Sequence, residues 1–392
     1  MALYGHSKYR KYYIISFYEN QPYILTLEKI GSIIILQKTS EETFMRQNFD
    51  SNMLVQKGRN RPGIKYHEIS EPAFRVCGVL FEDGAFVRMP KAVAETVSPG
   101  IAQDYVTNAG GRIRFVTDSP YIAVSAELTH IYQFASMSIE GTCGMDVYAD
   151  GVFLGVIRPN VDELSLHLSE IVNMRKTGEH VVEINLPLYT GVKNIVIGLD
   201  ENAVLKPASE YKYEAPIVFY GSSITNGACA SRPGLAYTSR VARALDANHK
   251  NLGFGGLCKG EQPMAEYIAS LDMSLFVLDY DYNAPNPEHL LATHENVYKT
   301  VRDRHPDLPI VMITAPKYTM PQGFEERKNI IKQTYERAKA AGDRNVYIIY
   351  GDEFFSGIGD DFSADNVHPT DLGFDYMTKA IYPVLKRALE DK

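Results

Sequence analysis

APIVFYGSSITNG, residues 215–227, is the stretch that decides the fold class of this 392-residue chain. Its first half is a short apolar run, typical of a strand buried inside a sheet. Its second half is a glycine- and serine-rich turn, and a helix is predicted after it over residues 235–246. In open α/β sheets, ligands bind beside the carboxyl ends of the strands. We therefore expect Ser223 to lie where the edge of a sheet meets a ligand.

The sequence around and after this stretch alternates between strand-like and helix-like patterns. Strands are predicted at residues 217–220, 250–252, 275–280, 310–314 and 346–350. Helices are predicted near residues 235–246, 264–270, 287–303, 325–341 and 372–389. This alternation is typical of a parallel sheet with helices on both faces. Residues 215–392 are therefore predicted to form an α/β domain.

The part of the chain before this domain shows short strands and turns instead. Strands are predicted at residues 112–116, 121–127, 180–186 and 192–199, and residues 146–154 form a hairpin around the two-residue turn Asp150-Gly151. Such strands with few helical runs indicate an antiparallel sandwich over residues 64–205. Residues 206–214 are predicted to be a polar linker. Residues 1–63, with strand-like runs at 12–18 and 32–37 and a polar stretch at 56–63, are predicted to be an extension of unknown role.

The composition of the chain argues against some classes of binding partner. A net charge of -8 and a pI near 5.7 argue against nucleic acid as the main partner. No run of 18 apolar residues is present, so no membrane span is expected, and the N-terminal apolar stretch lacks the cleavage site of a signal peptide. The four cysteines lack zinc-site spacing, and reduced thiols in a cytoplasmic protein fit them best.

A second motif, Asp365-Asn366-Val367-His368-Pro369, precedes the last predicted helix. A short loop of this kind can fold so that the aspartate holds one imidazole nitrogen while the other points outward. A general base needs such a fixed tautomer and aim. With Ser223 the order along the chain would be Ser, Asp, His, and because the order varies between folds, geometry must decide.

Acyl transfer from an ester also needs donors for the oxyanion that forms when serine attacks a carbonyl. A glycine-rich loop, Asn251-Leu252-Gly253-Phe254-Gly255-Gly256, ends the second predicted strand, and its backbone N–H groups could approach a ligand closely. Asn283 follows the third strand and offers a neutral amide donor. All of these segments lie at carboxyl ends of strands, so they can converge on one crevice.

Taken together, these segments resemble the four conserved blocks of the SGNH (GDSL) hydrolase superfamily. Gly144-Met145-Asp146-Val147-Tyr148 resembles the Gly-x-Asp-Leu-Tyr signature of one branch, with Val in place of Leu. The resemblance covers about residues 64–392. It implies a three-layer, flavodoxin-like hydrolase domain with a parallel sheet, preceded by a jelly-roll-like antiparallel β-sandwich.

The resemblance also implies roles for individual residues. Ser223 would be the nucleophile, His368 the base and Asp365 the orienting acid. The oxyanion hole would combine the N–H groups of Ser223 and Gly256 with the Asn283 side chain. The family needs no metal or cofactor, and its members are esterases, thioesterases and carbohydrate deacetylases.

Three positions depart from the family pattern. Ser222 replaces an aspartate, which we expect to remove one acceptor for loop N–H groups. Asp281 replaces a glycine and Ala284 an aspartate, which leaves the shape of the pocket open.

Each motif also has a plainer interpretation. Ser223 and the glycines could serve turns only, Asn283 could bond its own loop, and the Asp365/His368 pair could be a helix cap beside a surface histidine. Cys229 or Cys258 could act as a nucleophile instead of Ser223, although a free cysteine is usually an inert small hydrophobe. Two further groups are weak evidence: the histidines 289 and 294, expected on a solvated helix face, and the tyrosines 237, 280 and 282, which could line a pocket.

The sequence thus predicts a serine ester hydrolase that removes acetyl or another short acyl group from a carbohydrate or small ester through an acyl-enzyme. Its activity should fall as the pH drops through the range in which histidine titrates, about pH 6.5. The alternatives are a carbohydrate-binding protein with a vestigial hydrolase domain, and a thioesterase or lysophospholipase of the same superfamily. The sequence leaves three points open: whether the protein forms a homo-oligomer, what its natural substrate is, and whether the sandwich binds sugar.

Overall fold

The computed structural model describes residues 62–159, 165–316 and 323–391, together with the backbone of three earlier strands. The chain divides into two compact units, Met1–Val55 and Gln56–Lys392. The first unit holds an antiparallel sheet in the order β1 (Tyr12–Tyr18), β2 (Gln21–Ile30) and β3 (Ile33–Lys38). The run predicted at 12–18 is thus β1, and the run predicted at 32–37 is part of β3 from Ile33 onward. Residues 56–61 of the predicted polar stretch lie outside the described residues.

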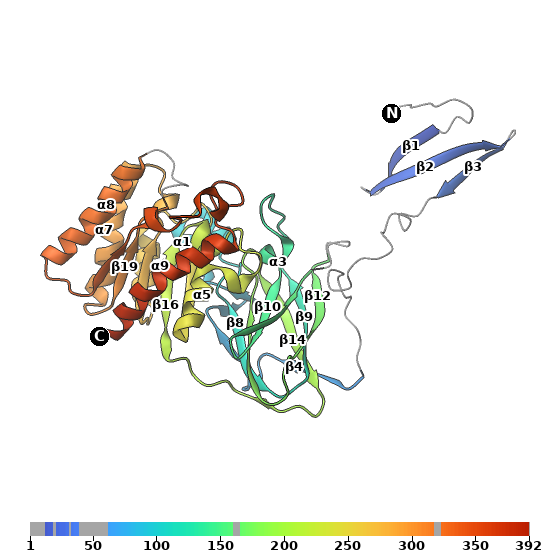
Figure 1. Cartoon of the computed structure of the whole chain (residues 1–392), viewed down its shortest axis with the longest axis horizontal. Helices are drawn as coiled ribbons and strands as arrows, with labels where there is room; N and C mark the ends of the chain where they lie inside the picture. Colours follow the sequence, from blue (N-terminus) through green and yellow to red (C-terminus); the bar gives the residue numbers. More distant parts are fainter. Residues whose placement is uncertain are drawn as a thin grey trace. The chain divides into compact units, whose positions relative to one another are not determined.

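The C-terminal half of the second unit is built on a five-stranded parallel sheet (Figure 1). The strand order is β17-β16-β18-β19-β20, so the first strand of the half lies between the second and the third. Because strand order reverses next to β16, a crevice is expected at the carboxyl end of β16. The bounds are β16 (Tyr213–Gly221), β17 (Ala247–Gly253), β18 (Leu275–Asp279), β19 (Ile310–Ile313) and β20 (Val346–Ile349).

Helices cover both faces of this sheet, as the alternation predicted. Along β16, Ile217 and Phe219 pack with α5 (Tyr237–Leu245) and α9 (Asp371–Glu390). The side chains of Val218 and Tyr220 point the other way, because successive residues of a strand alternate between its faces. They pack against α6 (Gln262–Ser270), α7 (Pro287–Arg304) and α8 (Phe324–Ala340). The part of β16 from Ile217 onward is buried, and it therefore appears in the sequence as a continuous apolar run.

The N-terminal half of this unit is an antiparallel sandwich, as predicted. One sheet has the order β11-β10-β13-β8-β15 with β5 paired to β8, and the other has the order β12-β9-β14-β4. Asp150 and Gly151 join β10 to β11 with φ angles of 49° and 76°, the left-handed pair that a tight hairpin turn requires. The bounds are β4 (Ile64–Glu68), β5 (Arg75–Cys77), β8 (Arg112–Thr117), β9 (Tyr121–Leu128), β10 (Met145–Ala149), β11 (Val152–Ile157), β12 (His167–Asn173), β13 (His180–Asn185), β14 (Val192–Asp200) and β15 (Leu205–Lys206).

Short elements that the sequence pattern did not predict interrupt the sandwich. The hairpin β6 (Leu80–Glu82) and β7 (Ala85–Val87) is followed by α1 (Lys91–Val97) and α2 (Pro99–Asp104), and α3 (Ile139–Thr142) precedes β10. Met89, Ala94 and Ile101, from the α1–α2 segment, are buried in the same core as α6 and α7. The sandwich half is therefore packed into the hydrophobic core of the α/β half.

The Gly144–Tyr148 signature anchors the two halves to each other. Asp146 is fully buried, and its Oδ2 accepts hydrogen bonds from Arg232 Nη1 (2.8 Å) and from the Gly234 N–H (2.9 Å). A Cβ atom at Gly234 would lie 2.7 Å from that same oxygen, so the close approach requires glycine. Gly234 lies in the 3-10 turn η3 (Pro233–Leu235), before α5. The signature thus holds the chain between Ser223 and α5 in place.

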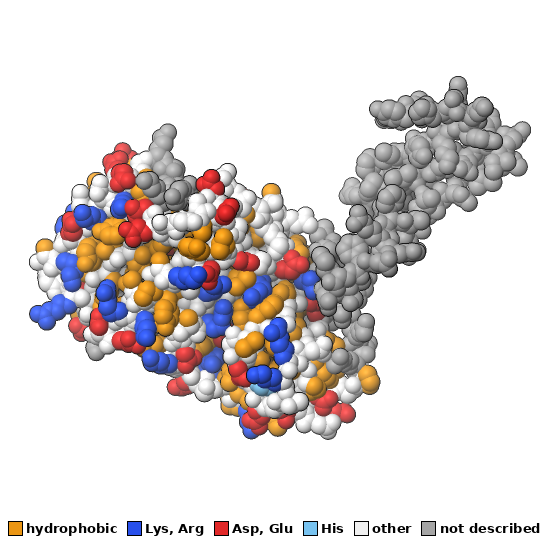
Figure 2. All heavy atoms as spheres, in the orientation of Figure 1, with side chains coloured by type: hydrophobic (Ala, Val, Ile, Leu, Met, Phe, Trp, Pro, Cys, Tyr) orange, Lys and Arg blue, Asp and Glu red, His pale blue; other side chains and the backbone are white. Residues whose placement is uncertain are grey.

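On the face shown in Figure 2, acidic and basic side chains are interspersed over the described part of the molecule. Among the described residues, no helix is long and apolar enough to cross a membrane. The expectation that His294 lies on a solvated helix face was wrong: it is buried under α8 and bonds Thr334 Oγ1 at 3.2 Å.

Candidate active site

Ser223 is the first residue of the four-residue helix α4 (Ser223–Asn226), directly after β16. The Ser222 side chain caps this helix by accepting a hydrogen bond from the Ile224 N–H at 3.1 Å. The Ser222 hydroxyl therefore still serves one N–H of α4, although serine has a single side-chain oxygen where an aspartate has two. The Ser223 N–H, as the first of a helix, has no partner within the helix.

The strand and the helix approach closely at Gly221, and this closeness fixes where Ser223 lies. A Cβ atom at Gly221 would lie 2.0 Å from Thr225 Oγ1 and 2.6 Å from the Asp279 carbonyl oxygen. Thr225 Oγ1 and the Tyr237 hydroxyl both donate to Asp279 Oδ2. Tyr237 therefore supports α4 from below and does not line the pocket.

The Asp365–His368 loop lies opposite Ser223 and is folded tightly on itself. Asp365 Oδ1 accepts hydrogen bonds from the N–H groups of Val367 (3.0 Å) and His368 (2.8 Å), and Asn366 takes a left-handed φ of 67° between them. The loop is closed by a bridge from Ser363 to Pro369, and Thr370 caps the following helix α9. The aspartate thus fixes the backbone that carries the histidine.

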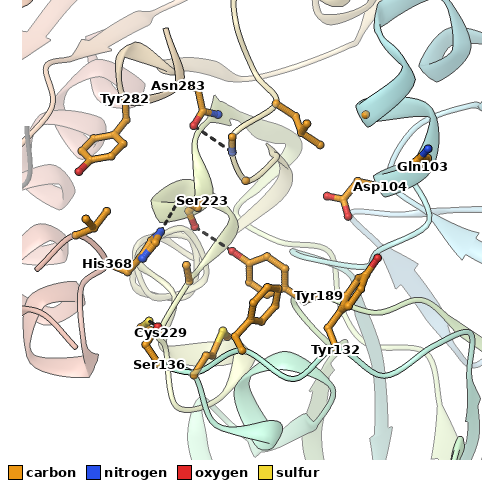
Figure 3. A pocket seen from close by; sticks show the side chains of 18 of the residues that line it. Gln103, Asp104, Tyr132, Ser136, Tyr189, Ser223, Cys229, Tyr282, Asn283 and His368 are labelled. Atoms are coloured by element: carbon orange, nitrogen blue, oxygen red, sulfur yellow. Dashed lines mark hydrogen bonds between the residues drawn. The ribbon is translucent and has the colours of Figure 1, made fainter. Parts of the chain in front are cut away.

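The side chains of Asp365, His368 and Ser223 form a hydrogen-bonded chain, and Figure 3 shows its link between His368 and Ser223. His368 Nδ1 lies 2.8 Å from Asp365 Oδ2, and His368 Nε2 lies 2.9 Å from Ser223 Oγ. Partial burial would raise the pKa of Asp365, but the His368 N–H, the imidazole and the Val367 N–H lower this pKa to about 2. Because an ionised carboxylate can only accept, the imidazole proton lies on Nδ1, and Nε2 accepts the Ser223 hydroxyl hydrogen. The arrangement could therefore deprotonate Ser223.

Gly256 and Asn283 lie next to each other on the far side of Ser223. The Gly256 N–H donates to Asn283 Oδ1 at 3.2 Å, and Asn283 Nδ2 donates to the Phe254 carbonyl oxygen at 2.9 Å. An amide nitrogen carries two hydrogens, so Asn283 keeps a second one for another acceptor. The Gly256 N–H is aimed at Asn283, so it could serve an oxyanion only by sharing its hydrogen.

Asp281, one of the departures from the family pattern, supports Asn283 from behind. Both lie in the 3-10 turn η4 (Asp281–Asn283). Asp281 Oδ2 accepts from the Ala315 N–H at 2.9 Å, and the buried Arg327 donates to the carbonyl oxygens of Asp281 and Ala284, each at 2.8 Å. Burial raises the pKa of Asp281 to about 6, although the Ala315 N–H and Arg327 act in the opposite direction. Asp281 therefore replaces the family's glycine with a tether to the next strand.

A pocket of about 820 Å³ opens above the serine, and the sandwich half supplies one of its walls. Tyr132 and Phe134, about half exposed, lie on the loop after β9, and Phe134 meets the Tyr189 ring edge-to-face at 4.9 Å. Figure 3 shows Tyr132 and Tyr189 on one side of the pocket and Tyr282 and Asn283 on another. Of the three tyrosines considered from the sequence, only Tyr282 lines this pocket, since Tyr280 is buried and bonds Thr293.

Arg88, which the sequence analysis missed, connects two loops of the site from beneath. It is fully buried, and it donates to Asn226 Oδ1 on α4 at 2.8 Å and to the Gly253 carbonyl oxygen of the glycine-rich loop. Its guanidinium also lies 3.6 Å from the centre of the Phe254 ring and pairs with Asp104 at 3.2 Å. No sequence pattern marks Arg88, because its partners lie far away in the chain.

The cysteines offer poor nucleophiles here. Cys258 is fully buried, and burial raises its pKa. Cys229 lines the pocket, and burial raises its pKa as well. Cys229, Asp365 and His368 each place a potential metal-binding atom within 4.8 Å of the others, the one such group found among the described residues. The Asp365 and His368 side chains are already joined by a hydrogen bond, so a metal ion here would have to break the pair that orients the imidazole.

Comparisons with known proteins identify two family matches along the chain. Residues 214–386 match the model of the GDSL-like lipase/acylhydrolase family, and residues 64–205 match the model of the GxDLY N-terminus of SGNH hydrolase-type esterases. Fold and matches together define an ester hydrolase of the SGNH class. The chain belongs to the SGNH (GDSL) hydrolase superfamily, in the branch with the GxDLY N-terminal region. A comparison with curated proteins gave no match.

Several solved structures share the fold over both halves of the second unit. A candidate GDSL-like lipase from Bacteroides ovatus is 29% identical, with a TM-score of 0.75 over 83% of this chain and 98% of that one. A salicylyl-acyltransferase from a tetracycline biosynthetic pathway is 21% identical, with a TM-score of 0.69 over 82% of this chain and 96% of that one. An acetyl xylan esterase from Butyrivibrio proteoclasticus is 15% identical, with a TM-score of 0.57 over 83% of this chain and 99% of that one. The last two show the fold alone.

Proposed function

We propose that this protein hydrolyses esters of acetyl or other short acyl groups on a carbohydrate or small molecule, with Ser223 as nucleophile. The observation that carries the proposal is the chain from Asp365 through His368 to Ser223, with contacts of 2.8 and 2.9 Å, at the floor of an open pocket. A nucleophile bonded to a base that is itself oriented by a third group is the arrangement that acyl transfer requires.

The proposed reaction proceeds in two halves. Ser223 Oγ attacks the carbonyl carbon while its proton moves to His368 Nε2, and the oxyanion is stabilised by the Ser223 N–H and the free hydrogen of Asn283, with Gly256 sharing its N–H. The leaving alcohol then takes the proton from Nε2 as its bond to the acyl carbon breaks. Water then attacks the acyl-enzyme and loses its proton to Nε2. As the bond between the acyl carbon and Ser223 Oγ breaks, Nε2 returns that proton to Oγ, and the acid product leaves.

The charges around the pocket favour a neutral ester over the charged alternatives. Among the described lining residues there is no lysine or arginine, and the carboxylate of Asp104 faces Arg88. A thioester of a phosphorylated carrier or a lysophospholipid would bring phosphate charge to a surface with no cation to receive it. The flat rings of Tyr132 and Phe134 instead offer surfaces against which a sugar or small acyl group could pack. This chemistry requires neither nucleic acid nor a membrane, and the cytoplasmic location stays a prediction.

The test is turnover of p-nitrophenyl acetate together with fluorophosphonate labelling and peptide mapping. Ser223→Ala should lose at least about 10³-fold in kcat and all labelling. Ser222→Ala is the matched control: it removes a helix cap at a cost of about 1 kcal/mol but leaves the nucleophile, so labelling should persist. Wild-type protein that neither turns over nor labels would instead favour a binding protein with a vestigial hydrolase domain. An adduct on Cys229 would show that Cys229, and not Ser223, is the nucleophile.

Preference among acyl groups is a separate question. A panel of p-nitrophenyl esters of increasing chain length, run beside acetylated xylo-oligosaccharides, should show the highest kcat/KM for short acyl groups. A maximum at long chains would replace the short-acyl proposal with the lysophospholipase alternative.

A further inference from the structure

We propose that Ser136, on the loop between β9 and α3 of the sandwich half, is a positioning residue that sets the basicity of His368 by acting on Asp365. This inference rests on the proposed function. Ser136 Oγ lies 3.0 Å from Asp365 Oδ2, the same oxygen that receives His368 Nδ1 at 2.8 Å. The sandwich half therefore reaches into the catalytic chain itself and does more than form a wall of the pocket.

The direction of each hydrogen bond in this group follows from chemistry. A carboxylate can only accept, so the Ser136 hydroxyl donates to Asp365. The Cys229 thiol lies 3.6 Å from Ser136 Oγ and donates to it. Because Cys229 uses a lone pair of Ser136, the hydroxyl hydrogen is directed away from the thiol and toward the carboxylate. Hydrogen bonds in such a chain reinforce one another.

The donated bond has a predictable effect on the base. Asp365 Oδ2 divides its negative charge between the imidazole and the Ser136 hydroxyl. Without Ser136, more of that charge would stabilise the imidazolium, so His368 would take up its proton at a higher pH. A protonated imidazole cannot accept the Ser223 proton, so the acid limb of the pH–rate profile should move upward.

Other titratable groups around the pair could produce a similar dependence, so they must be considered. Burial raises the pKa of Cys229, and Asp365 acts in the same direction. Other titratable or charged side chains on the elements around this part of the pocket include His130, Tyr132, Tyr189, Tyr282, Asp104, Asp360, Asp361, Asp371, Asp375 and Lys379. Of these groups, Cys229 loses a partner when Ser136 is replaced. Because the bond to Ser136 lowers the pKa of the thiol, its loss moves that pKa further up and away from the acid limb. A shift of the acid limb therefore reports on the Ser136–Asp365 bond.

The experiment compares pH profiles of kcat/KM for p-nitrophenyl acetate in wild type, Ser136→Ala, Ser136→Thr and Ser138→Ala. Ser136→Ala should move the midpoint of the acid limb up by roughly 0.3–1 pH unit and lower kcat more than it changes KM. Ser136→Thr keeps the hydroxyl and should restore the wild-type midpoint. Ser138 lies on the same loop and bonds the Ser231 carbonyl oxygen at 3.2 Å, so Ser138→Ala should leave the midpoint in place.

The outcomes separate this inference from the proposed function. Thermal unfolding and fluorophosphonate labelling of Ser223 are measured on every variant. If Ser136→Ala folds and labels but keeps the wild-type midpoint, the role of Ser136 is refuted while the serine mechanism stands. If the wild type does not label, the proposed function itself fails. A midpoint that moves equally in Ser138→Ala would assign the effect to the loop as a whole and also refute the proposal.

Discussion

Arg88 Nη1 donates a hydrogen bond to Asn226 Oδ1 over 2.8 Å, although the two residues lie 138 positions apart in the chain. Asn226 is the last residue of the helix that Ser223 begins, and Arg88 also donates to the Gly253 carbonyl oxygen at the start of the glycine-rich loop. One buried cation from the sandwich half therefore connects the proposed nucleophile with a proposed oxyanion loop. Arg88 therefore sets the spacing between α4 and the glycine-rich loop, although it belongs to neither segment.

We predict that Arg88→Lys lowers kcat by about tenfold or more while KM changes little, because a lysine point charge cannot bridge two acceptors as a planar guanidinium does. Unfolding should also occur at a lower temperature, since the ion pair with Asp104 and the stacking on Phe254 are weakened. Stopped-flow or steady-state kinetics test the change in kcat, and thermal melts test the change in unfolding temperature. Arg75→Lys is the control: its partly exposed pair with Glu214 lies outside the pocket lining, and kcat should not change. A fully active Arg88→Lys would show that the loops hold their spacing unaided.

Asn283 can be tested with a pair of substitutions. Asn283→Ala removes the amide donor, and the loss in kcat should be about 10²–10³-fold. Asn283→Asp keeps an acceptor for the Gly256 N–H but places a negative charge beside the developing oxyanion. The aspartate variant should therefore be the slower of the two at neutral pH. If alanine were the more damaging change, the main role of Asn283 would be to hold Gly256, and the donor role would be wrong.

The aromatic wall should act on binding more than on chemistry. Phe134→Ala and Tyr132→Ala should raise KM for acetylated oligosaccharides several-fold, because each removes a ring that packs at the pocket mouth. The kcat for p-nitrophenyl acetate should stay within about twofold, since the groups that contact the reacting atoms are unchanged. Phe81→Ala, which removes a 65% exposed ring on β6, is the matched control and should alter neither constant. Equal KM values in all three variants would mean that the oligosaccharide does not pack against Tyr132 or Phe134.

Local sequence patterns predicted much of this fold and part of the candidate site. The apolar run 217–220 and the alternation after it predicted the parallel sheet, because a strand buried on both faces must be apolar throughout. The spacing of Asp365 and His368 predicted their contact, because three residues of loop suffice to bring the carboxylate to the imidazole. The left-handed turn at Asp150-Gly151 was likewise a local property of its two residues.

What the sequence did not show depends on contacts between distant segments. Ser136 touches a residue 229 positions later, and Arg88 reaches Gly253 across 165 positions. No sequence pattern near Ser136 or Arg88 indicates which residue it contacts. The helices α1 and α2 are short, α1 following directly on Pro90 and α2 beginning at Pro99, so no helical period is long enough to be recognised. Asp281 looked like a departure from a family pattern, and only the packing of Arg327 and Ala315 explains it.

Asp365 makes a prediction about both activity and acid stability. Its pKa in the folded protein is lowered to about 2, below the ordinary value near 3.8, so the folded state favours the ionised form. The stabilisation it provides is present above pH 4 and is lost as the pH falls from about 4 toward 2. Asp365→Asn, which cannot ionise, should lack this dependence, so the stability difference between wild type and variant should shrink across that window in chemical denaturation at a series of pH values. At pH 7 the same variant should lose about 10³–10⁴-fold in kcat, because an amide can donate to Nδ1 and favour the tautomer whose Nε2 carries the proton. A variant that kept wild-type turnover at pH 7 would mean that His368 holds its tautomer without Asp365, and the hydrogen-bonded chain would then have no catalytic meaning.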